Sequence, residues 1–210
     1  MRSPRELETL MRDVARALWA GESAEVLVGN LVVLAREAEE GSTVWRFAHR
    51  ELALAVSEID PWRASLLARR LLELAPTDHV GWATLALAQS LLGNLAYAVR
   101  CYERAIGLSP HQPRYAHNLG HLYDVALDLP EKAIPLLERA HRAEPRCAHV
   151  AASYAHALGR AGRPDEALTV LRVALRGGAT RDQAALLAWL EKQAEPAFPR
   201  TPSSMPQSAR

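Results

Sequence analysis

The sequence predicts an all-α protein built from stacked antiparallel helix pairs. Of its 210 residues, 49% are hydrophobic but only 6% are aromatic, and Ala, Leu and Arg dominate, which is typical of helices rather than strands. Apolar residues recur at the spacing of one helical face, and the pattern returns with a period of 34 or 35 residues. A sustained period of this length indicates repeated two-helix units rather than a plain helical bundle.

The first 44 residues predict a helical pair that precedes the repeats. The segment Ser3–Glu6 has the pattern of a capping box, with a proline at the first helical position. We expect this helix to end near Trp19 and a second helix to cover residues 23–39. We assign residues 1–44 to this pair, as an N-terminal cap or a diverged repeat.

The clearest repeat unit covers residues 79–112. Its first helix places Trp82, Leu85, Ala86 and Gln89 on one face, a turn follows at Gly93, and its second helix repeats the pattern with Ala98, Tyr102 and Ala105. Prolines mark the ends of successive units, because proline cannot continue a helix. These are Pro76, Pro110 and Pro145, at intervals of 34 and 35 residues.

This pattern of Trp, Leu-small, Gly, Ala, Tyr, Ala and Pro resembles the tetratricopeptide repeat (TPR) family. The resemblance implies a right-handed superhelical stack of antiparallel helix pairs, an α-solenoid, over residues 45–181. Its units would be residues 45–78, which are degenerate, 79–112, 113–147 and 148–181. The third unit has one extra residue, which we place near Asp128–Leu129.

Two further segments follow the repeats. A second capping box begins at Thr180, and its helix predicts a closing cap over residues 182–194. Residues 195–210 are rich in Pro and Ser, and we expect them to be disordered.

The resemblance also implies where a partner binds, because the first helices of such repeats line a concave groove. The predicted groove residues are Arg46, His49, Arg50, Ala53, Thr84, Leu87, Arg114, His117, Asn118, His121, Val125, His149, Ser153, His156 and Arg160. Histidines and arginines predominate in this set, and arginine pairs well with carboxylates. We therefore expect an acidic protein segment as the partner, bound more tightly below about pH 6.5, where unperturbed histidines become charged.

The composition and motifs narrow the function. A net charge of +1 argues against nucleic-acid or membrane-surface binding. The sequence contains no phosphate-binding loop, nucleophile elbow or HExxH motif, so we expect neither an enzyme nor a cofactor. No stretch predicts membrane insertion, and two cysteines without a CxxC motif favour a reducing compartment. We expect a cytoplasmic, bacterial protein.

The leading interpretation is thus a non-catalytic adaptor or scaffold for a protein partner. Three alternatives remain open. The chain's build is similar to that of the dedicated chaperones of type III secretion translocators. It is also compatible with a structural protein that assembles with itself as a homo-oligomer. Finally, His117 and His121 have metal-ligand spacing on one helix, and His149, His156 or Cys147 would have to complete such a site.

Overall fold

The computed structural model describes residues 2–195. Within them the chain forms eleven α-helices and no strand, which confirms the all-α class. The helices are α1 (Pro4–Trp19), α2 (Ala24–Glu37), α3 (Thr43–Ala55), α4 (Pro61–Leu74), α5 (His79–Leu91), α6 (Leu95–Leu108), α7 (Pro113–His121), α8 (Pro130–Ala143), α9 (Ala148–Arg160), α10 (Pro164–Ala174) and α11 (Arg181–Ala194), with a π-helical turn, η1 (Leu122–Ala126), and a 3₁₀ turn, η2 (Leu175–Gly177).

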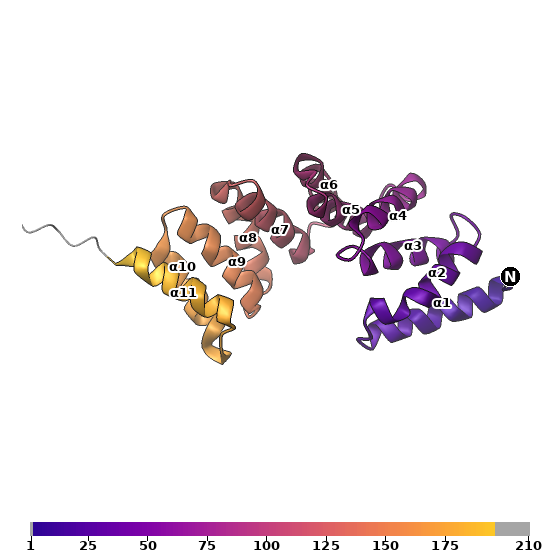
Figure 1. Ribbon diagram of the computed structural model, residues 1–210, viewed down its shortest axis with the longest axis horizontal. Coiled ribbons are helices and arrows are strands. Elements are labelled where there is room, and N and C mark those ends of the chain that lie inside the picture. Colours follow the sequence, from indigo (N-terminus) through magenta and orange to yellow (C-terminus); the bar gives the residue numbers. More distant parts are fainter. Residues whose placement is uncertain (1, 196–210) are drawn as a thin grey trace, which may run out of the picture.

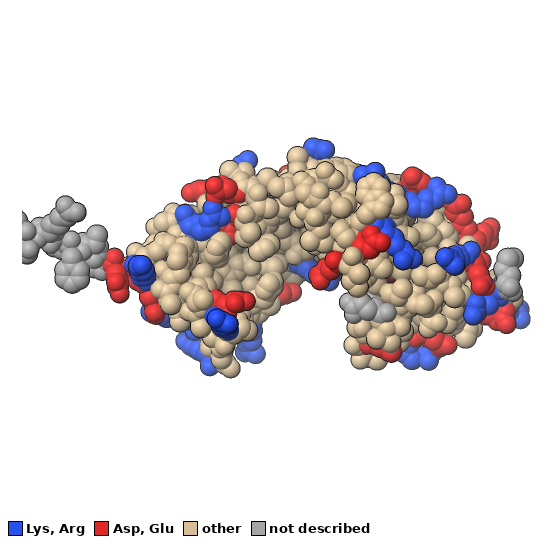
Figure 2. All heavy atoms as spheres, in the orientation of Figure 1, with Lys and Arg blue, Asp and Glu red and all other residues tan. Residues whose placement is uncertain are grey.

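Successive helices reverse direction and stack into an arch (Figure 1). The N-terminal helices form one limb of the arch and α9–α11 form the other. Figure 2 shows the surface hollowed between these limbs, with charged side chains gathered toward the two ends on this face. Each helix packs mainly on its neighbours in the chain, as expected of a solenoid.

Polar side chains cap the helices at the positions where these begin. Ser3 and Glu6 form the expected capping box, in which the Ser3 amide donates to Oε2 of Glu6 at 2.6 Å. Asp78 caps α5 by accepting from the Gly81 amide at 2.8 Å. Thr180 begins α11 with the second capping box. Each cap satisfies an amide that has no partner within its helix and contributes about 1 kcal/mol.

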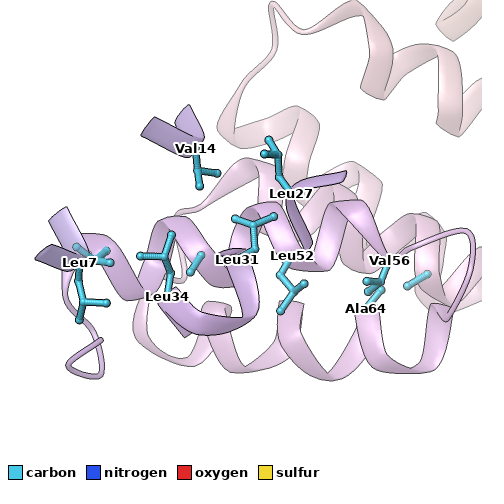
Figure 3. Packing of buried hydrophobic residues seen from close by; sticks show 11 residues of the cluster. Leu7, Val14, Leu27, Leu31, Leu34, Leu52, Val56 and Ala64 are labelled. Carbon is cyan, nitrogen blue, oxygen red and sulfur yellow. The ribbon is translucent and has the colours of Figure 1, made fainter. Parts of the chain in front are cut away.

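The core is a series of local clusters rather than one centre. The first cluster joins α1, α2 and α3 through side chains that include Leu7, Val14, Leu31 and Leu52 (Figure 3). Farther along, alanines such as Ala98 have no exposed surface and let paired helices approach closely. The last cluster includes Leu190 of the closing helix α11.

The extra residue of the third repeat enters a helix rather than the loop where we predicted it. The turn that joins its two helices, residues 127–129, has three residues, like the turns 92–94 and 161–163. The additional residue is accommodated by the π turn η1, which widens the end of the helix. Asp128 adopts a positive φ of 57° where the other two turns have Gly93 and Gly162, a conformation that Asp tolerates better than most residues.

The Pro/Ser-rich tail predicted from residue 195 onward lies outside the described residues, apart from Glu195. No helix within residues 2–195 combines the length and apolar character needed to cross a bilayer.

Candidate functional site

A cleft of about 700 Å³ runs along α5 and α7, continues onto η1, and is bordered by the end of α3 and the residues that follow it. Its walls are mainly aliphatic. The side chains that form them include Leu54, Val80, Leu87, Leu91, Leu122 and Val125. Tyr102 also lines the cleft, and burial raises its pKa to about 12, so its hydroxyl is a neutral polar group.

Six of the predicted groove residues line this cleft: Thr84, Leu87, Arg114, Asn118, His121 and Val125. Arg114 and Asn118 lie one turn apart on α7, which places both on the same face. Thr84 is buried, with 3% of its surface exposed, so it contributes to the floor of the cleft. The cleft therefore combines an aliphatic interior with a polar edge along α7.

The prediction missed most of the aliphatic lining, including Val80, Ala83 and Leu91. A signal for them exists in the sequence. Val80, Leu87 and Leu91 follow a helical spacing that is separate from the core stripe of Leu85 and Gln89. A helix with two apolar stripes buries one in its own stack, and α5 exposes the second to the cleft.

Two other predicted residues are part of the packed interior. His49 is 8% exposed, and its Nδ1 lies 3.0 Å from the carbonyl oxygen of Trp45 in its own helix. Ala53 is 1% exposed. Neither side chain is accessible to a partner, because α3 turns this face toward the adjoining helices.

The arginine next to His49 is already paired. Arg50 donates from Nε to Oδ2 of Asp78 at 3.0 Å, and its Nη2 contacts the same oxygen. Asp78 thus caps α5 and neutralises Arg50. Arg46 lies beside this pair, in a smaller depression of about 340 Å³ outside the cleft.

The predicted basic residues of α9 are also engaged within the chain. Arg160 donates from Nη1 to Oδ1 of Asp124 at 3.1 Å and also contacts Asp128, and Nδ1 of His156 lies 2.5 Å from Oδ2 of Asp124. These contacts balance the charge of Asp124, which is 1% exposed. The groove therefore offers less free positive charge than the sequence predicted.

The remaining histidines lie between α7 and α9. His117 is 7% exposed, and its Nε2 lies 3.0 Å from Oγ of Ser153. Its ring centroid lies 4.9 Å from that of His149 and 6.3 Å from that of His121. Burial lowers the pKa of His117 to about 4, so it stays neutral at pH 6.5, where we had expected it to begin to charge.

Among the side chains that the structure describes, no three from His, Cys, Asp or Glu converge in an arrangement that could hold a metal ion. Burial also raises the pKa of the Cys101 thiol to about 11.

The cleft itself presents an amide, a guanidinium and aliphatic surface, a set suited to binding a segment of another molecule.

Residues 81–112 and residues 125–190 each match a family model described as tetratricopeptide repeat. Protein FlbA of Caulobacter vibrioides is 31% identical over 174 residues, which cover 82% of this chain and 28% of that protein. The chain thus spans little more than a quarter of the length of this curated relative.

Solved structures show the same fold at low sequence identity. TTC0263, a thermophilic TPR protein of Thermus thermophilus, has a TM-score of 0.65 and 19% identity, covering 89% of this chain and 98% of its own. YrrB, described as a TPR protein with an unusual peptide-binding site, has a TM-score of 0.63 and 17% identity, covering 79% and 85% of the two chains. MamA has a TM-score of 0.62 and 19% identity, covering 94% and 99%. The repeat matches, the helical stack and these neighbours agree: the chain is a member of the tetratricopeptide repeat family, with an all-α solenoid fold.

Proposed function

We propose that this chain is a non-catalytic adaptor that docks a segment of a partner protein in the cleft of α3, α5 and α7. One observation carries the proposal, namely a cleft of about 700 Å³ with aliphatic walls and a polar edge. Clefts of this size are typical of binding sites. Repeat solenoids also use the surface formed by successive units for recognition.

The exposure of the cleft walls supports docking. Leu91 is 51% exposed and Val125 is 55% exposed, although both are aliphatic. Removing such surface from water is favourable by roughly 25 cal/mol per Å². A partner that covers these side chains gains this free energy without any rearrangement of the stack.

The test compares two matched variants, Val125→Lys in the cleft and Val173→Lys on α10. Val173 is 52% exposed and does not line the cleft, so both changes place a lysine at a similarly exposed valine. Full-length wild-type and variant chains would be coupled to beads and exposed to native lysate, and the retained proteins identified by mass spectrometry. The proposal expects a partner that Val125→Lys loses and Val173→Lys retains. A partner that survives Val125→Lys would move the binding surface elsewhere.

A further inference from the structure

The cleft has charged side chains at its two ends, and their arrangement indicates what kind of segment it takes. Val80 lies near the beginning of α5 and Leu91 is its last residue, and both line the cleft. Helices rise 1.5 Å per residue, so the cleft is about 17 Å long, which matches three turns of a helix or about five extended residues.

Arg114 stands at one end of the cleft. It lies in the first turn of α7 and is exposed. Unlike Arg50 and Arg160, it has no carboxylate within ion-pair distance among the side chains that the structure describes. The Arg114 guanidinium is thus available to an acidic group of a ligand.

Glu58 stands at the other end. It follows the last turn of α3 and is exposed, and no Lys, Arg or His of residues 2–195 lies within ion-pair distance of it. Each helix reverses on the one before it, so α3, α5 and α7 run in the same direction. The beginning of α7 and the end of α3 therefore lie at opposite ends of the cleft.

We propose that the cleft binds a partner segment with bulky aliphatic side chains in its middle, an acidic residue at the Arg114 end and a basic residue at the Glu58 end. This inference rests on the proposed docking function and refines its partner. The aliphatic middle covers Leu87, Leu91 and Val125, which supplies affinity. The opposite charges at the two ends fix the direction in which the segment lies. A purely acidic segment, as the sequence predicted, would place like charge against Glu58.

The experiment pans a random library of displayed peptides, about twelve residues long to match three helical turns, on the full chain. Binders to the Val125→Lys variant are removed first. We expect the enriched peptides to combine an acidic residue near one end, at least two large aliphatic residues, and a basic residue near the other end. Their synthetic versions should bind Val125→Lys about tenfold more weakly or worse, and Val173→Lys as tightly as wild type.

A charge exchange then tests the direction. Arg114→Glu should weaken binding about tenfold, and a peptide whose acidic residue is replaced by Lys should recover most of that loss on Arg114→Glu alone. Likewise, Glu58→Lys should weaken binding about tenfold, and a peptide whose basic residue is replaced by Glu should recover most of that loss on Glu58→Lys alone. Failure of both exchanges would overturn the inference while leaving the docking function intact.

Other outcomes distinguish the proposed partner segment from other occupants of the cleft. Cleft-dependent peptides that are only acidic would overturn the inference but support docking. Failure to enrich any peptide after depletion of the Val125→Lys binders would overturn both. Displacement of an enriched peptide by a synthetic peptide of residues 196–210, which contains no acidic residue, would identify the chain's own segment as the occupant. Self-association in light scattering that Val125→Lys abolishes would identify a second copy. Either result would overturn the inference.

Discussion

Arg160 of α9 donates to Oδ1 of Asp124 in η1 at 3.1 Å and so ties the third repeat to the fourth. Asp124 lies in the π turn η1, and Leu122 and Val125 of the same turn line the cleft. One wall of the cleft is therefore held in place by an ion pair with the next repeat. His156 contributes a second contact to the same carboxylate.

Replacement of Asp124 by Asn should destabilise the protein. The side chain of Asp124 is 2% exposed while that of Arg160 is 28% exposed, so solvent partly compensates the guanidinium once the carboxylate is gone. We expect a loss of about 2 kcal/mol in the free energy of unfolding, measured by urea denaturation.

The matched control is Asp128→Asn. The side chain of Asp128 also contacts Arg160 but is 81% exposed, and Asn tolerates the positive φ at this position. It should cost less than about 1 kcal/mol. Equal losses for the two variants would show that burial of Asp124 is not what makes its contact important.

The repeat period was readable from the sequence because it depends on local spacing of apolar, small and proline residues. The position of the extra residue was not. Whether an inserted residue lies in a helix or in a loop depends on the contacts of the side chains that it shifts. Asp124 contacts Arg160, which lies 36 residues away along the chain. A count along the chain locates the insertion only between Gly120 and Asp128.

Part of the candidate site was also predictable from local spacing along the helices. Arg114 and Asn118 follow from the helical face that the core leaves free. The partners of Arg50 and Arg160 do not, because Asp78 caps a neighbouring helix and Asp128 lies in a turn. Counting charges on the first helices alone therefore overestimated how basic the groove is.

Burial of His117 should make stability depend on pH. Its pKa is about 4 in the folded chain and about 6.5 when unfolded. As the pH falls below about 6.5, the unfolded chain takes up a proton that the folded chain does not, so the free energy of unfolding decreases until about pH 4. The groups that face His117 are Asn118, Ser153, His149 and His121. The contribution of His117 is about 3 kcal/mol at most.

Urea denaturation at a series of pH values would measure this dependence. His117→Gln should flatten the curve between about pH 6.5 and pH 4. Some slope should remain, because burial lowers the pKa of His49 as well. An unaltered slope in His117→Gln would show that the pH dependence does not come from the lowered pKa of His117.

The two cysteines should differ in reactivity. Cys101 is 1% exposed, and burial raises its pKa to about 11, whereas Cys147 is partly exposed. Thiolates rather than thiols react, so an aromatic disulfide reagent at neutral pH should label Cys147 in the folded chain and Cys101 only after denaturation. Rapid labelling of both thiols in the folded protein, with Cys147→Ser as the reference, would show that α6 opens readily.

The closing helix α11 depends on a glycine in α9. A Cβ added at Gly159 would lie 2.5 Å from Cδ2 of Leu190 and 2.5 Å from Cζ3 of Trp189, closer than atoms can pack. Gly159→Ala should therefore push α11 away from the stack, cost about 1–3 kcal/mol, and raise hydrogen exchange in residues 181–194. Gly107→Ala is the control, because nothing lies within 4 Å of its added Cβ. This change should stabilise α6 by about 0.5–1 kcal/mol. If both variants gained stability, the side chains of Leu190 and Trp189 would be able to move aside from the added Cβ without displacing α11.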